Sequence, residues 1–258
     1  MGAGESCHGP YKVSNGDQMK AIILAGGKGT RLAPYTTILP KPLMPVDDRP
    51  ILDIVIHQLV HYGIDEIILS VGYLAGLLEA YYQDGSRFGI PISYVREPEP
   101  LGTAGPVALI NQQHSLDETF LMMNGDVLTD FNYRHLIDYH NEKKGILTIA
   151  MHTKQQKIDL GVMHVNDNYE LTDYIEKPTL DYQVSMGIYI FDPAVLKYIQ
   201  PGVRLDFNEL VLSLVKKHRE PVFGYPCTDY WLDIGRHDDY EQATEVFMQH
   251  KSKFLGEE

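Results

Sequence analysis

Cysteine and positive charge are both scarce in this sequence, and each shortage excludes a class of protein. The two cysteines, Cys7 and Cys227, are too few for a disulfide framework or a four-cysteine zinc site. Any bound metal must therefore be held by oxygen atoms. Lysine and arginine total 22 against 35 aspartates and glutamates, which gives a net charge of −13. This charge opposes binding to long nucleic acids, whose affinity depends on basic side chains that neutralise phosphates.

Long apolar runs and targeting signals are also missing. No stretch approaches the roughly 18 to 20 apolar residues that a membrane-spanning helix requires. The N-terminal segment contains no basic stretch followed by the apolar region of a secretory signal. We therefore expect a cytoplasmic protein with neither a membrane nor a nucleic acid as its partner.

The sequence does contain enough apolar material for one substantial core and a small second lobe. Its 258 residues are 44% hydrophobic and 22% charged, which excludes global disorder, collagen and coiled coil. Residues 1–18 are polar and show no periodicity, so we interpret them as a disordered leader or an expression-vector scar. The folded part is expected to begin at Met19 and to cover residues 19–258.

Short apolar runs alternate with helical spacing, and this alternation predicts an α/β fold. A run at residues 20–25, a helical pattern at 50–62 and a β-branched run at 66–71 form one strand–helix–strand unit. A mostly parallel sheet covered by helices is the natural way to bury such elements. Further helices are expected at residues 74–83 and 103–113, and further strands at 92–96 and 119–124.

After Tyr139 the pattern changes to short strands separated by turns, which indicates a mixed sheet. A final helix is expected from about His237, and the last strand and helix are expected to return to the first half of the chain. The other strands are expected at residues 146–152, 161–165, 170–176, 184–191 and 221–225, with helices at 193–199 and 206–218.

The strongest motif is a glycine-rich loop directly after the first expected strand. Residues 24–32 read LAGGKGTRL, and residues 40–43 read PKPL. Glycines let successive backbone N–H groups point at phosphate oxygens, and Arg31 and Lys41 can add charge-assisted hydrogen bonds. Three glycines, two cations and flanking prolines in this order favour a polyphosphate site over an ordinary glycine turn.

Two common phosphate-binding motifs do not fit this loop. A Walker A loop needs Ser or Thr after its lysine, whereas Lys28 is followed by Gly29. The dinucleotide fingerprint needs a third glycine where Leu32 stands, although Asp47 lies near the acidic position of that motif. A nicotinamide-dependent oxidoreductase is therefore only an alternative.

The two halves of the loop, LAGGxGTRLxPxT and PKPLxPV, resemble the signature of the sugar-phosphate nucleotidyltransferases, also called NDP-sugar pyrophosphorylases. The resemblance runs from Met19 to about Phe247. It implies a Rossmann-like α/β domain with a smaller sugar-binding lobe, in an enzyme that joins a nucleoside triphosphate to a sugar 1-phosphate and releases pyrophosphate. The implied nucleotide-binding core covers about 19–142 and 226–250, and the implied sugar-binding lobe covers about 143–225.

A second motif, Asn124-Gly125-Asp126, follows an apolar strand at the edge where open α/β sheets place their ligands. Asp126 is a candidate metal ligand, and Asp233 in the segment WLDIG is its candidate partner. Mg²⁺ prefers oxygen and is typically held by one or two carboxylates plus substrate phosphates. Both positions match the two metal-binding aspartates of the family, whereas the Gly-Asp pair alone would indicate a plain turn.

The third motif, Glu176-Lys177-Pro178, follows an expected strand. A lysine held rigidly before proline can neutralise a phosphate monoester. The resemblance implies that Lys177 contacts the sugar phosphate and that Glu176 contacts sugar hydroxyls, whereas the motif in isolation would indicate an exposed charged turn. The sugar-binding residues that the family implies are Gly161, Glu176, Lys177, Ser185 and Gly187.

Residues 185–187 leave the sugar unidentified. Many guanylyl-transferring relatives read Asn-Ala-Gly where this chain reads Ser-Met-Gly, so a shorter hydroxyl replaces an amide. Gly161 and Gly187 fit the family's sugar-binding strands, and they fit β-bulges or close packing equally well. A mannose- or heptose-type sugar 1-phosphate is favoured, and other sugars stay open.

Residues 96–105, REPEPLGTAG, bear on the base of the nucleotide. Glu97 aligns with a base-contacting glutamine of thymidylyl-transferring relatives, and an ionised carboxylate only accepts hydrogen bonds. Guanine offers two adjacent donors, whereas thymine and uracil offer one N–H between carbonyls, so GTP is favoured and CTP comes second. The stretch EPLGTAGP also resembles the mannose 1-phosphate guanylyltransferase branch. The expected nucleotide-binding residues are Leu24, Ala25, Gly26, Gly27, Gly29, Thr30, Arg31, Glu97, Gly102 and Thr103.

These residues predict a direct in-line attack of the sugar 1-phosphate on the α-phosphate of the nucleotide. Arg31 and Lys41 are expected to hold the triphosphate and to stabilise the leaving pyrophosphate. Lys177 is expected to align the attacking phosphate. Asp126 and Asp233 are expected to hold Mg²⁺ across the reacting groups.

Two further interpretations stay open. The same reaction can use CTP, dTTP or UTP with another sugar 1-phosphate, or the chain can be a catalytically silent regulatory subunit. A silent subunit is expected to have lost its charged site residues, and this chain keeps them. A homo-oligomer is expected only because it is common in the family, and the sequence indicates neither allosteric control nor a pathway.

Overall fold

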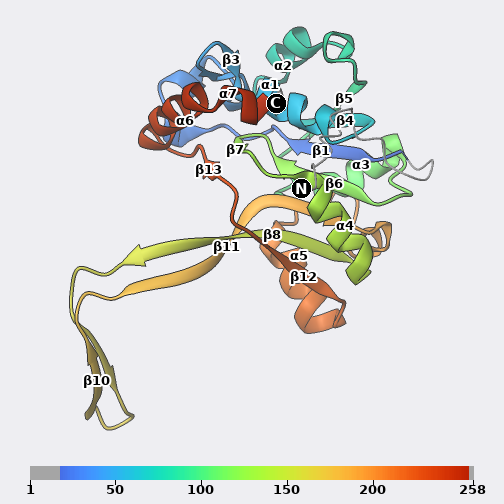
Figure 1. The fold of residues 1–258 in the computed structure, drawn as a ribbon. Coiled ribbons are helices and arrows are strands. Elements are labelled where there is room, and N and C mark those ends of the chain that lie inside the picture. The colour runs from blue at the N-terminus through green and yellow to red at the C-terminus, as the bar shows by residue number, and fades with distance from the viewer. Residues whose placement is uncertain (1–17, 256–258) are drawn as a thin grey trace, which may run out of the picture.

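A seven-stranded sheet forms the centre of the computed structural model, which describes residues 18–255; the expected leader thus lies, apart from Gln18, outside the described residues. Its strands in chain order are β1 (Lys20–Leu24), β4 (Glu66–Val71), β5 (Ile92–Arg96), β6 (Phe120–Asn124), β8 (Leu147–Lys157), β11 (Thr179–Phe191) and β12 (Val222–Cys227). Their order across the sheet is β12-β8-β11-β6-β1-β4-β5 (Figure 1). Only β11 runs against its neighbours, which confirms the expected mixed and mostly parallel sheet.

Helices cover both faces of this sheet. Successive side chains of a strand point to opposite faces, so the apolar strands present apolar side chains that must be buried on both. Ile23 of β1 lies in the apolar cluster on one face, and Ile22 lies in the cluster on the other. The first face packs against α1 (Ile51–His61), α2 (Ala75–Tyr82) and α4 (Tyr133–Lys143); the second packs against α3 (Pro106–His114), the 3-10 helix η5 (Pro193–Tyr198) and α5 (Phe207–Leu212). Among the described residues, no helix is long and apolar enough to cross a membrane.

Several elements differ from the sequence-based expectation. The helix expected at residues 193–199 is a 3-10 helix, and the helix expected at 206–218 changes after α5 into a π-helical segment, η6 (Ser213–His218). Helix α4 was not expected, because its buried positions 133, 136, 137 and 140 include a histidine in place of an apolar residue. Strands β8 and β11 are longer than expected, because their outer residues pair only with each other and those of β8 are all polar.

The C-terminal segment returns to the first half of the chain. Strand β13 (Trp231–Asp233) pairs antiparallel with β7 (Val127–Thr129), so Asp233 lies opposite Val127. Helices α6 (His237–Gln249) and α7 (Lys251–Leu255) then contribute to a third apolar cluster that includes Leu32. This return places the end of the chain beside the glycine-rich loop.

Four parallel strands, β1, β4, β5 and β6, end at the same edge of the sheet. The loops that follow them begin at Ala25, Gly72, Glu97 and Gly125. Parallel alignment therefore brings four segments that are distant in the sequence to one place. The loop after β1 continues through short elements: the 3-10 helices η1 (Thr30–Leu32), η2 (Tyr35–Thr37) and η3 (Lys41–Leu43), and strands β2 (Pro45–Val46) and β3 (Arg49–Pro50); η4 (Ser86–Phe88) follows α2.

A two-stranded ribbon extends from this same edge. Strands β8 and β11 continue past the sheet and lead to a hairpin of β9 (Val162–Val165) and β10 (Leu171–Ile175). We name residues 153–183 the arm, and Figure 1 shows that it projects away from the body of the molecule. Strands β8, β11 and β12, which were expected in the sugar-binding lobe, belong to the central sheet, and the limits of core and lobe stay a prediction.

The joint between β6 and β11 yields a prediction about stability. Phe191 is fully buried and stacks on Phe120 directly across this joint, with ring centroids 5.3 Å apart. Phe191→Ala is expected to lower the free energy of unfolding by about 3–5 kcal/mol, because it leaves a cavity in the core. Urea unfolding measures this change, and Met248→Ala is the control: Met248 is 61% exposed, so its loss is expected to stay within about 0.5 kcal/mol. Equal losses in the two variants would contradict the role of the stacked pair.

Candidate active site

Two adjoining hollows lie at the carboxyl edge of the parallel strands. Their volumes are about 620 and 300 Å³, and both are lined by Leu24, Gly27 and Asp126. The larger volume is typical of small-molecule sites. The larger hollow is also lined by Gly26, Lys28, Gly72, Tyr73, Glu97, Pro98, Glu99, Pro100, Gly102, Thr103, Asn124 and Arg204, and the smaller by Ala25, Gly29, Thr30, Arg31, Lys41, Pro42 and Gly125.

The glycine-rich loop lies directly against the loop after β4. A Cβ atom on Gly26 would lie 3.3 Å from the backbone nitrogen of Gly72 and 3.1 Å from Oε1 of Glu97. The Tyr73 amide also donates a hydrogen bond to the Gly26 carbonyl, at 3.3 Å. A side chain at position 26 would therefore push apart the loops that form the larger hollow.

The next turn of the loop brings the two cations to the smaller hollow. Gly29 has a left-handed backbone with a φ of 60°, and its carbonyl accepts a hydrogen bond from the Thr36 hydroxyl at 2.8 Å. Arg31 follows in η1, and its guanidinium lies against Gly235, where an added Cβ would be 3.2 Å from Nη1. Gly235 in WLDIG therefore leaves room for the arginine that the first motif supplies.

Lys41 and the candidate metal ligand Asp126 form a charged group at the smaller hollow, whereas the second candidate ligand, Asp233, lines neither hollow. Lys41 is 7% exposed, and its Nζ donates to Oδ2 of Asp126. The same charges act on Asp233. Burial and the Asp126 carboxylate raise the pKa of Asp233, while Lys41 and Arg31 lower it. Two carboxylates and two cations thus share one partly dehydrated region.

Asp126 has the geometry expected of a ligand for a cation. Its Oδ1 is buried and has no hydrogen-bond partner among the described residues, whereas Oδ2 contacts Lys41. A buried carboxylate oxygen without a partner is costly, and a bound cation would satisfy it. Within residues 18–255 there is no cluster of three or more His, Cys, Asp or Glu side chains that could hold a metal. The residues present therefore fit a hard cation held by two carboxylates, with further oxygens from a substrate.

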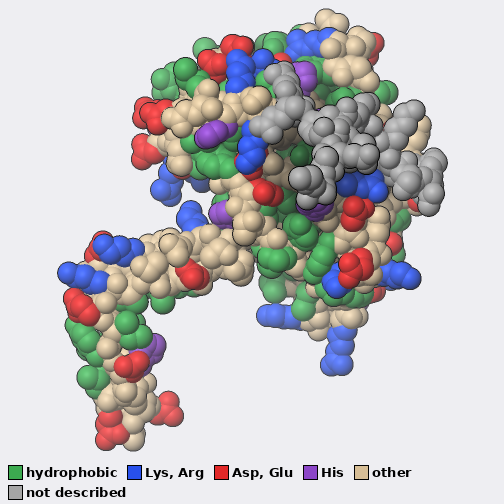
Figure 2. Space-filling view, in the orientation of Figure 1, with side chains coloured by type: hydrophobic (Ala, Val, Ile, Leu, Met, Phe, Trp, Pro, Cys, Tyr) green, Lys and Arg blue, Asp and Glu red, His purple; other side chains and the backbone are tan. Residues whose placement is uncertain are grey.

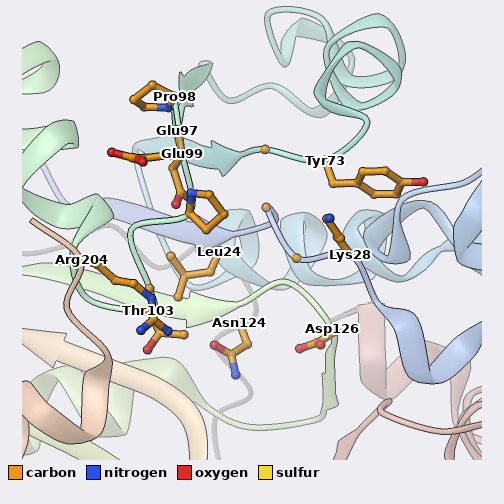
Figure 3. Close-up of a pocket in the computed structure, with 15 residues that line it drawn as sticks. Leu24, Lys28, Tyr73, Glu97, Pro98, Glu99, Thr103, Asn124, Asp126 and Arg204 are labelled. Carbon is orange, nitrogen blue, oxygen red and sulfur yellow. The ribbon is translucent and has the colours of Figure 1, made fainter. Parts of the chain in front are cut away.

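Glu97 lies in the wall of the larger hollow and is held there by the chain. Its Oε1 accepts from the Ser70 hydroxyl at 2.9 Å, and its Oε2 accepts from the backbone N–H of Leu101 at 3.0 Å. Figure 3 shows Glu97 on the opposite side of the hollow from Asn124 and Asp126. Each carboxylate oxygen keeps a further lone pair, so the group can still accept hydrogen bonds from a ligand.

One residue in the lining of the larger hollow, Arg204, comes from the second half of the chain. Gly102 has a φ of 82°, and a Cβ there would lie 2.5 Å from the Leu205 carbonyl. Thr103, whose hydroxyl accepts from the Phe207 amide at 2.8 Å, also holds this segment. The contact brings Arg204 into the lining (Figure 3).

Ser185 and Gly187 lie where β11 enters the sheet. The pairing register with β8 shifts between Ser185 and Tyr189, and Gly187 has a φ of 75°. A Cβ at Gly187 would lie 2.6 Å from Nδ2 of Asn124, which lines the larger hollow. Gly187 thus combines a β-bulge with close packing against the site, as its motif allowed.

The structure does not bring the other expected sugar-binding residues to the hollows. Gly161, Glu176 and Lys177 lie on the arm and line neither hollow. The side chains of Glu176 and Lys177 are 60% and 58% exposed, and their charged groups are 4.0 Å apart. Lys177 has a left-handed φ of 47° directly before Pro178, a conformation that is strained for a residue in this position.

Sequence reasoning missed several residues of the site. Gly72 and Tyr73 follow a parallel strand at the carboxyl edge, and this position was a usable signal. The Asn-Gly-Asp motif indicates a role for its aspartate and none for Asn124. Lys28 is not the lysine of a Walker A loop, because Gly29 follows it. Arg204 carries no local signal, because it reaches the site only through the packing of Gly102 against Leu205.

Comparisons with known proteins agree with this architecture. The family model described as "Nucleotidyl transferase" matches residues 20–250. The chain is 34% identical over 91% of its length to a UTP–glucose-1-phosphate uridylyltransferase from Synechocystis, and 31% identical over 88% to a mannose-1-phosphate guanylyltransferase from Mycobacterium tuberculosis. The crystal structure of HddC from Yersinia pseudotuberculosis shares its fold with a TM-score of 0.70, at 24% identity, over 89% of this chain and 100% of that one.

The chain spans 65% of the length of the Synechocystis relative and 64% of the Mycobacterium relative. Within that span the family model covers β1 to α6, and thus every strand and loop that forms the two hollows. The chain belongs to the nucleotidyl transferase family.

Proposed function

We propose that this chain is a nucleotidyltransferase that joins a nucleoside triphosphate, with GTP favoured, to a sugar 1-phosphate, with release of pyrophosphate. The observation that carries the proposal is the pair of adjoining hollows, one bordered by Arg31 and Lys41 and both bordered by Asp126. One hollow has the size for a base and ribose, and the other has the charge for a triphosphate. The named relatives include guanylyl- and uridylyltransferases, which supports the reaction class.

The smaller hollow is suited to the phosphates. Backbone N–H groups of the glycine-rich loop and the cations Arg31 and Lys41 bind the triphosphate and stabilise negative charge on the departing pyrophosphate. Lys28, which is exposed and lines the larger hollow, extends this positive region. These groups need only position the substrates and offset charge, because in-line transfer to a phosphate requires no covalent enzyme intermediate.

Asp126 and Asp233 would hold the divalent cation, for which we propose Mg²⁺. When bound, the ion would offset charge on the α-phosphate and on the attacking phosphate. The partnerless Oδ1 of Asp126 and the closeness of the two carboxylates support this assignment. The carboxylate of Asp126 also accepts a hydrogen bond from Lys41. In this proposal Asp126 therefore both binds the metal ion and orients the lysine that binds the triphosphate.

The larger hollow is suited to the base and ribose, with Glu97 as the group that favours guanine. Glu97 accepts hydrogen bonds only, and the N1–H and N2–H₂ groups of guanine can donate to it together. Gly102 and Thr103 form the neighbouring backbone surface. CTP, dTTP or UTP with another sugar 1-phosphate is the second candidate, supported by the uridylyltransferase among the relatives.

We propose a mannose- or heptose-type sugar 1-phosphate as the second substrate, bound by Gly161, Glu176, Lys177, Ser185 and Gly187. Lys177 neutralises the attacking phosphate in this proposal. We also propose that the protein is cytoplasmic and that the chain self-associates. A catalytically silent subunit is disfavoured, because Arg31, Lys41 and Asp126 form one charged site instead of being scattered.

The decisive experiment is a pyrophosphate-release assay with Mg²⁺. It tests GTP, CTP, dTTP, UTP and ATP against mannose, glucose and heptose 1-phosphates. Turnover with GTP supports the role of Glu97 and identifies the sugar at the same time. Binding of a nucleotide without turnover in any pair would refute the proposed catalytic function.

Asp126→Asn tests the charged group at the smaller hollow. The amide keeps an oxygen toward Lys41, so folding is expected to survive, but the site loses one negative charge. We expect kcat to fall at least about 100-fold, because the cation loses a charged ligand. Asp138→Asn, on the surface of α4, is the matched control and is expected to keep wild-type turnover. Thermal unfolding of both variants checks the fold, and unchanged kcat in Asp126→Asn would overturn the assignment.

Glu97→Gln tests the choice of base. Because the amide presents both a donor and an acceptor, we expect the ratio of kcat/KM for GTP to that for dTTP or UTP to fall about 10- to 100-fold. Glu118→Gln makes the same chemical change at an exposed position that lines neither hollow, and its ratio is expected to stay at the wild-type value. If both variants keep the wild-type ratio, Glu97 holds the loop and does not recognise the base.

A further inference from the structure

The arm exposes an unusual amount of apolar surface. Eight of the sixteen exposed large hydrophobic residues of the described chain lie in residues 153–183, and Tyr169 is 87% exposed. Figure 2 shows hydrophobic side chains gathered along the arm. A two-stranded hairpin is only marginally stable in water without a covering surface. The eight residues are Leu160, Met163, Val165, Tyr169, Leu171, Tyr174, Ile175 and Tyr182.

The arm also carries Glu176 and Lys177, which the proposed reaction needs at the hollows. Lys177 and Gly187 are both on the continuous segment that contains β11, and Gly187 packs against Asn124 in the wall of the larger hollow. Nine residues lie between them, and an extended strand of that length spans about 30 Å. Lys177, the residue proposed to bind the attacking phosphate, therefore lines neither hollow of its own copy.

Hydrogen bonds at the base of the arm fix the direction in which the arm leaves the sheet. The indole N–H of Trp231 donates to the Met186 carbonyl at 2.8 Å, and the Gly187 amide donates to the Ser185 hydroxyl at 3.3 Å. Beyond this base, β8 and β11 pair without a further register shift from the Ser185–Met151 pair to the Thr179–Lys157 pair. For the arm to fold back onto its own hollows, this ladder or its anchored base would have to break.

We infer that the arm of one copy of this chain completes the hollows of a second copy, to which it supplies Lys177 and Glu176. The inference rests on the proposed function for the role of these two residues. The arm leaves the body at the carboxyl edge of the sheet, which is also the edge that carries the hollows. Two copies that face each other through this edge exchange arms in a symmetric pair, so each active site contains residues of both chains.

The apolar surface of the arm has the size for such an interface. The exposed parts of its eight large side chains amount to roughly 960 Å², if each side chain offers about 200 Å² when fully exposed. Two arms supply roughly 1,900 Å², which is within the range of stable protein–protein interfaces. A second copy therefore accounts both for the uncovered apolar residues and for the missing lysine.

Chemical crosslinking tests the inference without reference to activity. An amine-reactive crosslinker is applied to the wild-type protein. The products that contain one chain and those that contain two are separated as bands on a denaturing gel, and each band is digested to identify linked peptides. We expect the linked Lys28–Lys177 peptide in the two-chain band, and its loss in Lys177→Arg. Recovery of this peptide from the one-chain band shows an arm that serves its own copy and overturns the inference. Absence of the peptide from both bands overturns it as well.

Complementation of two inactive variants tests the same arrangement in the reaction. Asp126→Asn and Lys177→Ala are coexpressed with different tags, and mixed pairs are purified through both tags. If Lys177 acts in the second copy, one of the two sites of each mixed pair is intact, so we expect about half of the wild-type turnover. If Lys177 acts in its own copy, both sites are damaged and no turnover returns.

A second mixed pair provides the control. Arg31→Ala with Asp126→Asn removes residues of the same chain's hollow, so neither site of the mixed pair is intact and no turnover is expected. Failure to recover any complex that carries both tags would overturn the inference. Wild-type protein without turnover would refute the proposed function instead, and the crosslinking result would still decide the position of the arm.

Discussion

The parallel alignment of β5, β4, β1 and β6 is the constraint on which the site depends. Because all four strands end at one edge, the loops after them must share the space there. Glycine at positions 26 and 72 is the direct consequence, since these loops pass within van der Waals contact. The reversed strand β11 adds a further segment at this edge, because it enters the sheet where its neighbours leave it.

The basic side chains at this edge differ in sign from the net charge of −13 of the whole chain. Arg31 and the nearly buried Lys41 lie together beside the glycine-rich loop. Asp126 offsets Lys41 when no substrate is bound, and burial together with Asp126 raises the pKa of Asp233. A polyphosphate bound as proposed would meet local positive charge and backbone N–H groups despite the overall repulsion.

The parts of the fold and site that the sequence predicts are those with local signals. The loop from Leu24 to Leu32 and the strand before Asn124 carry their glycines, cations and apolar runs in order, and both lie where expected. Arg204 could not be predicted, because only the packing of Gly102 on Leu205 brings it to the site. The direction of the arm could not be predicted either, since it depends on pairing of β11 with the outer half of β8, TKQQK, which has no apolar alternation.

The return of the C-terminal segment has a consequence for synthesis of the protein. Leu32, near the N-terminus, shares an apolar cluster with Phe247 of α6, and Arg31 lies against Gly235. About two hundred residues separate these partners, so a ribosome needs roughly 10–40 s between them. During that interval the apolar side of the glycine-rich segment stays uncovered in the nascent chain. Chaperones that shield short apolar segments would therefore act on this segment before the rest of the molecule closes over it.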